Sequence, residues 1–238
     1  MSYRILTEFE NLFAGKVYRH RNSSLGDFVA MHLYEDLATL NRSTKLMQRV
    51  ISRDWVLNTA NKRQGIAARR GDGTFGEIVP GEKAISDPGY QVARGKVATV
   101  EIGIEVKILA KAMIKQIDRV IGDLQKQVTE FKRGGGSSPP LCIGVVGINH
   151  AHTYTSFEGT RSFTTDGSGT YRHPSQEASE AERRLVQFAA PHYDEFIILH
   201  FEATNEQLYP FSWVNLTLIS QNYGSALVRV SREYDRRF

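Results

Sequence analysis

Acidic residues and a lysine stand at alternate positions of one apolar run. Between Val97 and Ile108, Glu101, Glu105 and Lys107 alternate with mostly β-branched residues. Side chains of a strand point alternately to its two faces, so these charges share one face, and Gly103 is expected to leave an open space between them. Carboxylates suit Mg²⁺ or Mn²⁺ held partly by water and substrate phosphate, and a neighbouring lysine can assist an attacking water. The pattern therefore predicts a metal site for phosphate chemistry.

A first acid for this site is expected from the segment upstream. If the chain folds back as a hairpin about Gly95, Asp87 comes to lie opposite Gly103 and beside Glu105. Two carboxylates at that separation repel each other and require a cation between them. Glu101, further back on the same strand, is the alternative first acid. We therefore predict Asp87 as the partner of Glu105, with Glu101 as its competitor.

These residues resemble a known nuclease pattern. Asp87, followed by Glu105-Val106-Lys107 at the end of a strand, then by a helix and another strand, is similar to the PD-(D/E)XK nuclease superfamily, which has the restriction endonuclease-like fold. The resemblance covers residues 77–149. It implies that Asp87, Glu105 and Val106 are metal ligands and that Lys107 is the catalytic lysine. In this sequence the proline follows the acid, as Asp87-Pro88, whereas in the family the proline precedes the acid.

The elements expected to position these residues follow directly in the sequence. Residues 109–132 carry apolar side chains at helical spacing, so they predict a helix that packs on the sheet. The segment 134–140 is rich in glycine, serine and proline and is typical of a connector. Residues 141–148 are wholly apolar and predict a buried strand parallel to the catalytic one. Cys142, the single cysteine, is expected to be buried in that strand.

The amino-terminal part is expected to be helical and basic. Ser24 can cap a first helix, and a second apolar-periodic stretch follows. The basic residues that follow are opposed by a single acid, Asp54, which predicts a surface for phosphate; the alternative is a solvated helix face. They are Arg42, Lys45, Arg49, Arg53, Lys62, Arg63, Arg69 and Arg70. We expect Arg63, Arg69 and Arg70 to contact nucleic acid.

A polar, aromatic-rich segment spans residues 149–174. Long polar loops at the carboxyl end of a strand are often functional, and we expect this one to contact DNA through Arg161 and Arg172. His150, His152 and His173 raise a zinc hypothesis, but their spacing matches no strong zinc pattern.

The remaining segments complete the sheet. Residues 71–76 formally match G-x-G-x-x-G, but no strand precedes them, so we interpret them as a turn into the sheet. A helix is predicted over residues 176–190 and a strand over 195–201. Residues 212–220 and 226–230 are expected to form a closing hairpin.

Length and composition favour one domain. The chain has 238 residues, of which 41% are hydrophobic, and a net charge of +4. We expect a single nuclease-like domain over residues 1–238, with a helical basic region at 1–70, a catalytic core at 71–149, and a loop, a helix and closing strands at 150–238. No apolar run near 18 residues and no leader sequence are visible, so a cytoplasmic location is expected.

Together these features predict an α/β protein with a mixed central sheet flanked by helices. The expected function is a Mg²⁺-dependent DNA endonuclease of restriction or defence type, with Mn²⁺ as an alternative ion. A symmetric cut across both strands of DNA would require two active sites and hence a homodimer. The alternatives are a nucleic-acid-binding module of the same fold without cleavage activity and a structural or partner-binding α/β protein.

Overall fold

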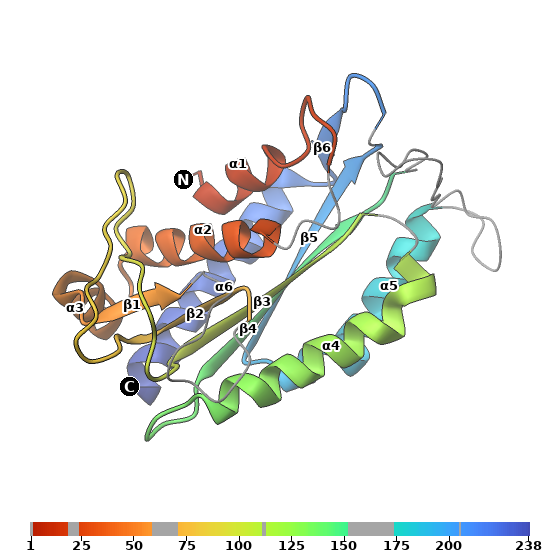
Figure 1. Ribbon diagram of the computed structural model, residues 1–238. Helices are drawn as coiled ribbons and strands as arrows, with labels where there is room; N and C mark the ends of the chain where they lie inside the picture. Colours follow the sequence, from red (N-terminus) through yellow and green to blue (C-terminus); the bar gives the residue numbers. More distant parts are fainter. Residues whose placement is uncertain (1, 19–23, 59–70, 111–112, 152–173, 205) are drawn as a thin grey trace.

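The computed structural model describes residues 2–18, 24–58, 71–110, 113–151, 174–204 and 206–238. Helices cover both faces of one mixed sheet of six strands, in the order β1-β2-β3-β4-β5-β6 (Figure 1). The expected α/β class with a helix-flanked mixed sheet is therefore confirmed. Within these described ranges, no helix is long and apolar enough to cross a membrane.

The strands follow their order in the sequence. Antiparallel pairs stand at both sides of the sheet, β1 with β2, β2 with β3, and β5 with β6, whereas β3, β4 and β5 run parallel. Because parallel neighbours need a crossover, a helix follows each of β3 and β4. The strands are β1 (Trp55–Asn58), β2 (Gly73–Glu77), β3 (Ile102–Leu109), β4 (Leu141–Asn149), β5 (Glu195–Ala203) and β6 (Phe211–Trp213).

The crossover helices lie on one face of the sheet and the others on the opposite face (Figure 1). The first group is α4 (Met113–Arg133), α5 (Pro174–Phe188) and the short η1 (Ala190–His192). The second is α1 (Arg4–Glu10), α2 (Ser24–Leu40), α3 (Thr44–Ser52) and α6 (Leu216–Arg237). Each face buries its own apolar cluster, and β4, apolar on both sides, is buried along its whole length. The predictions of a buried strand here and of a buried Cys142 are confirmed.

The alternation predicted for the catalytic strand holds within β3. Ile102, Ile104 and Val106 join the core beneath α1, α2 and α6, so Glu105 and Lys107 face the side of α4 and α5. The strand is shorter than expected because residues before it bridge to other segments, Val97 to Ile78 and Val100 to Gly135.

Two predicted elements are wrong. Residues 212–220 and 226–230 do not form a closing hairpin; most of them belong to α6. The side chain of Asn215 accepts a hydrogen bond from the amide of Leu218 at 3.0 Å and so caps this helix. Its buried residues recur at helical spacing: Ile219, Tyr223, Ala226, Leu227, Val230, Ser231 and Tyr234. The amino-terminal region is also not wholly helical, because β1 lies within it.

Candidate active site

Glu105 and Lys107 stand side by side on β3. Their side chains form an ion pair between Nζ of Lys107 and Oε1 of Glu105, and the glutamate is buried. The open space expected at Gly103 is absent, because a Cβ atom there would lie 2.4 Å from the ring of Phe131 on α4. The aromatic ring therefore fills the space over Gly103, next to Glu105 on the same strand. A substrate would have to reach Glu105 and Lys107 from another side.

The acid that the structure brings to this pair is Asp72. It immediately precedes β2, whose first residue, Gly73, is the partner of Ile104, so in antiparallel register Asp72 falls opposite Glu105. The amide of Asp72 donates to the carbonyl of Ile104 at 3.1 Å. Its Oδ2 accepts a hydrogen bond at 2.7 Å from the amide of Val106, the residue between Glu105 and Lys107. Asp72 is thus fastened to β3 at the predicted acid-x-lysine unit.

Tyr193 packs beside this part of the sheet. Burial raises the pKa of the Tyr193 phenol, and the charges of Glu105, Cys142 and Asp72 raise it further. Its hydroxyl donates to the carbonyl of Leu124 on α4 at 2.9 Å.

The amino terminus of α2 lies against the Asp72 carboxylate. A Cβ atom at Gly26 would lie 2.4 Å from Cγ of Asp72, so glycine is the residue that allows this approach. The unpaired amides at the start of a helix carry partial positive charge, which favours a carboxylate at this position. Helix α2 and strand β3 therefore hold Asp72 from two sides.

The predicted position of Asp87 is wrong. The partners of Gly103 are Thr74 and Cys142, and the segment that carries Asp87 instead pairs through Arg94 with Leu57 of β1. Strands β1 and β2 thus lie between that segment and β3, which at the usual strand spacing puts Arg94 roughly 14 Å from β3. A two-pronged contact with Arg94, with Nη2 of the arginine 2.7 Å from Oδ1, lowers the pKa of Asp87. The hairpin closes between Ile85 and Arg94, so it does not turn about Gly95.

Glu101, the alternative first acid, is occupied elsewhere. Its carboxylate accepts hydrogen bonds from Nε1 of Trp55 at 3.0 Å, from the hydroxyl of Tyr234, and from the guanidinium of Arg49. The guanidinium of Arg49 also lies 4.8 Å from the ring of Trp55. These contacts join α3, β1 and α6, so Glu101 has a structural role in the core.

Sequence reasoning missed Asp72 because Gly71-Asp72-Gly73 was assigned to a turn. The sequence offered one usable signal, an acid between two glycines directly before a short run of strand-forming residues. The sequence does not show which segment pairs with β3, since both residues 73–77 and the segment before Gly95 could pair with that strand. The observed register shows that residues 73–77 are the partner.

The expected nucleic-acid contacts lie outside the described residues. This applies to Arg63, Arg69, Arg70, Arg161 and Arg172, as well as to His152 and His173. Within the described part of the basic run, two members make intramolecular contacts. Arg49 pairs with Glu101, and Nζ of Lys45 donates to the carbonyl of Asp235 at 2.6 Å.

The oxygen donors at the acid-x-lysine unit are the carboxylates of Asp72, which lies against α2, and of Glu105, which faces α4 and α5. Two carboxylates stand on facing strands, and the carbonyl of Val106 points to the same edge of β3 as its amide. Among the described residues, no three His, Cys, Asp or Glu side chains are grouped so that they could hold a metal ion. Mg²⁺ commonly uses one or two carboxylates and completes its shell with water and phosphate, so this smaller set is compatible with it.

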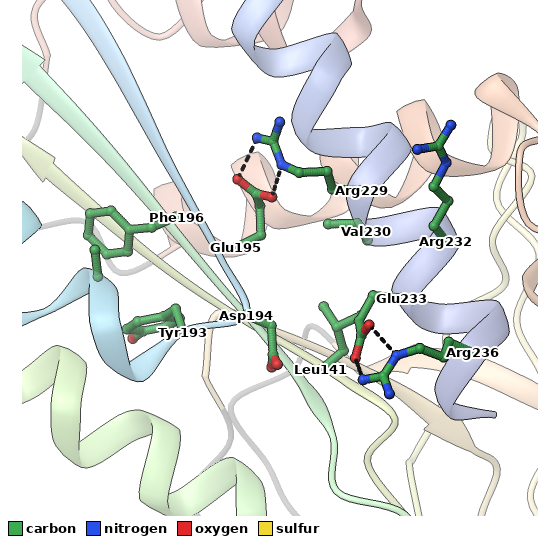
Figure 2. Close-up of a pocket in the computed structure, with 11 residues that line it drawn as sticks. Leu141, Tyr193, Asp194, Glu195, Phe196, Arg229, Val230, Arg232, Glu233 and Arg236 are labelled. Atoms are coloured by element: carbon green, nitrogen blue, oxygen red, sulfur yellow. Dashed lines mark hydrogen bonds and ion pairs between the residues drawn. The ribbon is translucent and has the colours of Figure 1, made fainter.

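A surface pocket lies at the other end of the parallel strands. It opens where β4 and β5 begin, and Figure 2 shows two ion pairs in its lining, Arg229 with Glu195 and Arg236 with Glu233. Its lining does not include Asp72, Glu105 or Lys107. The lining residues are Leu141, Ala190, Tyr193, Asp194, Glu195, Phe196, Arg229, Val230, Arg232, Glu233 and Arg236.

Comparisons of the chain with protein-family models, with curated proteins and with solved structures found no match.

Proposed function

We propose that the protein is a metal-dependent endonuclease that hydrolyses DNA phosphodiester bonds, of a restriction or defence type. The observation that carries this proposal is the hydrogen bond between Asp72 and the amide of Val106. It joins an acid directly before one strand to a Glu-x-Lys unit on the next, and these groups together can serve metal-assisted phosphodiester hydrolysis. Asp72 takes the role that the sequence assigned to Asp87.

We also propose that the domain has the restriction endonuclease-like fold. The support is that the acid-x-lysine strand β3 is followed by α4 and then by the parallel strand β4, which is the order expected from the sequence resemblance. The antiparallel strand β2 adds the first acid at the side of β3 away from β4.

Asp72, Glu105 and the carbonyl of Val106 would hold Mg²⁺, or Mn²⁺ in its place. The bound ion would lower the pKa of a water molecule and neutralise charge on the phosphate. Lys107 lies next to Glu105 and supplies a cation that can orient the water or stabilise the pentacovalent transition state. The amino terminus of α2 lies against the Asp72 carboxylate and helps to hold it in place.

The test is Mg²⁺-dependent cleavage of supercoiled plasmid DNA by the full chain. We expect Glu105→Gln and Lys107→Ala each to lower the cleavage rate by at least about 100-fold, because each removes a group that acts on the transition state. DNA affinity should change little, since phosphate contacts made elsewhere dominate binding. Salt-sensitive binding without cleavage by the wild type would favour a binding module, and wild-type rates in both variants would refute the active-site assignment.

A homodimer is part of the proposal. One active site cuts one strand, so a symmetric double-strand break requires two sites related by a two-fold axis. Sedimentation of the protein with and without DNA tests this requirement directly.

A further inference from the structure

A second group of ionisable side chains lies at the carboxyl ends of β4 and β5. Its base is the buried Asn149, whose side-chain amide donates to the carbonyls of Ala110 at 3.0 Å and Ala203 at 2.7 Å. Its side-chain oxygen accepts from the amides of Ala151 and Ala203, each at 3.0 Å. One side chain thus ties together the ends of three parallel strands and fixes the position of the next residue, His150.

His150 meets two side chains from other elements. Its ring lies edge-on to that of His200 on β5, with centroids 5.2 Å apart. Nε2 of His200 lies 2.9 Å from Oε2 of Glu182 on α5. The backbone amide of His150 donates to the carbonyl of Phe201 at 2.8 Å, which anchors this residue to β5.

One nitrogen in this group has no partner. Nε2 of His150 is buried and makes no hydrogen bond. Leaving a buried polar atom unpaired destabilises the folded state, so a native structure that retains one calls for an explanation such as an absent ion.

We propose that His150, His200 and Glu182 bind a divalent transition-metal ion of the zinc class. Two histidines and one glutamate, with a water in the fourth position, are a ligand set that zinc uses in proteins. As the side chains stand, their donor atoms do not converge on one point, because Glu182 is hydrogen-bonded directly to His200. Zinc would replace that bond. Two ligands at tetrahedral zinc lie about 3.3 Å apart, so the His200 nitrogen and the Glu182 oxygen, now 2.9 Å apart, need to separate only slightly.

This site is distinct from the one around Glu105. His200 pairs with Ile148, which in turn pairs with Leu109, so His200 lies two strands across from Lys107 and two residues further along. At the usual strand dimensions this separation is about 12 Å. The proposal therefore does not depend on nuclease activity.

The experiment is a titration of the chelator-treated full chain with Co²⁺, which reports low-coordinate nitrogen and oxygen ligation by its visible absorption. We expect one equivalent to bind, and Zn²⁺ to displace it. His150→Ala and His200→Ala should each weaken binding by at least about 100-fold, since each removes a ligand. His192→Ala removes an exposed histidine beside Gln125 and is the matched control, with unchanged binding expected.

Two further measurements keep the proposal open to refutation. If a histidine-to-alanine variant is poorly folded by circular dichroism, Glu182→Gln tests the same site by changing one ligand with little change of shape. Glu105→Gln should leave Co²⁺ binding intact, and loss of binding in that variant alone would put the ion at the other site. A wild type that binds no Co²⁺, or His150 and Glu182 variants that bind it normally, would overturn the proposal.

Discussion

Asp72 accepts a hydrogen bond of 2.7 Å from the backbone amide of Val106. This contact brings the start of β2 to the only described strand in which an acid and a lysine stand two residues apart on the face of α4 and α5. A side chain that bonds to a backbone amide holds its position whichever residue occupies the middle of the Glu-x-Lys unit. Asp72 is therefore fixed beside β3 by the geometry of the main chain.

The first prediction tests whether Asp72 or Asp87 is the acid that takes part in cleavage. Asp72→Asn should lower Mg²⁺-dependent plasmid cleavage by at least about 100-fold, because an amide replaces a charged metal ligand at nearly constant shape. Asp87→Asn should change the rate by less than about threefold, since Asp87 contacts Arg94 beyond β1. Initial cleavage rates at saturating Mg²⁺ measure both effects.

The reverse result would restore the sequence-based assignment. If Asp87→Asn were inactive while Asp72→Asn cleaved normally, the arrangement around Val106 would have no catalytic meaning. Circular dichroism spectra of both variants exclude unfolding as the cause.

The second prediction concerns the space at Gly26. Gly26→Ala would place Cβ 2.4 Å from Cγ of Asp72, so the carboxylate must move away from its bond to Val106. We expect cleavage to fall by at least about tenfold and the Mg²⁺ concentration for half-maximal rate to rise. Gly122→Ala, in α4, meets no atom within 4 Å and should stabilise the protein by up to about 1 kcal/mol.

Thermodynamic coupling identifies the cause of any Gly26 effect. In a protein that already carries Asp72→Ala, Gly26→Ala should stabilise the helix by about as much as is expected for Gly122→Ala. The reason is that the carboxylate atoms that the new methyl group would displace are absent. Urea denaturation of the two single variants and the double variant measures this coupling without reference to activity. Additive free energies would show that the two residues do not interact.

The parts of the fold that periodic patterns specify could be predicted from the sequence. The helix now assigned as α4, the buried strand β4, and the alternation of Ile104, Glu105 and Val106 in β3 all follow from repeats of 3.6 or 2 residues. The Glu-x-Lys unit was found for the same reason, since its two charges share a strand. Such patterns report how one element is oriented relative to the core.

Partners across the sheet could not be predicted in the same way. Whether β3 pairs with 73–77 or with the segment before Gly95 depends on loop paths and side-chain packing, which a periodic pattern does not encode. The same limit applies to α6. Its β-branched residues favour a hairpin in the sequence, whereas in the structure Asn215 caps a helix and Tyr223 packs in the core. The sequence therefore revealed two members of the candidate site and misplaced the third.

The third prediction tests the structural role of Glu101. Glu101→Ala should lower the free energy of unfolding by about 3–5 kcal/mol, because it removes the carboxylate that neutralises the largely buried Arg49. Glu82→Ala breaks an exposed ion pair with Lys96 and should cost at most about 1 kcal/mol. The cleavage rate per folded molecule should be unchanged in both variants, and a selective loss of activity in Glu101→Ala would return Glu101 to the active site.

The fourth prediction is a pH dependence of stability that arises at His32. This residue of α2 is buried against Phe28, with ring centroids 4.4 Å apart, and neither of its ring nitrogens has a hydrogen-bond partner. Burial lowers its pKa from 6.5 to about 4, outweighing the opposite effect of Glu8, while Arg4 adds to the lowering. The folded protein therefore keeps this imidazole neutral well below the pH at which the unfolded chain protonates it.

The sign of the effect follows from proton uptake. Between pH 6.5 and about 4 the unfolded state binds more protons at His32 than the folded state does, so stability falls as the pH is lowered through this range. The loss attributable to His32 approaches about 3 kcal/mol at the acid end, and it is absent above pH 7. His32→Phe retains an aromatic ring but cannot bind a proton, so the free energy of unfolding of this variant should fall less steeply between pH 7 and pH 4.5. Urea denaturation at intervals of half a pH unit compares the two curves, with His32→Leu as a second variant if phenylalanine does not fit. Parallel curves for the wild type and both variants would mean that His32 takes up its proton equally in the folded and unfolded states.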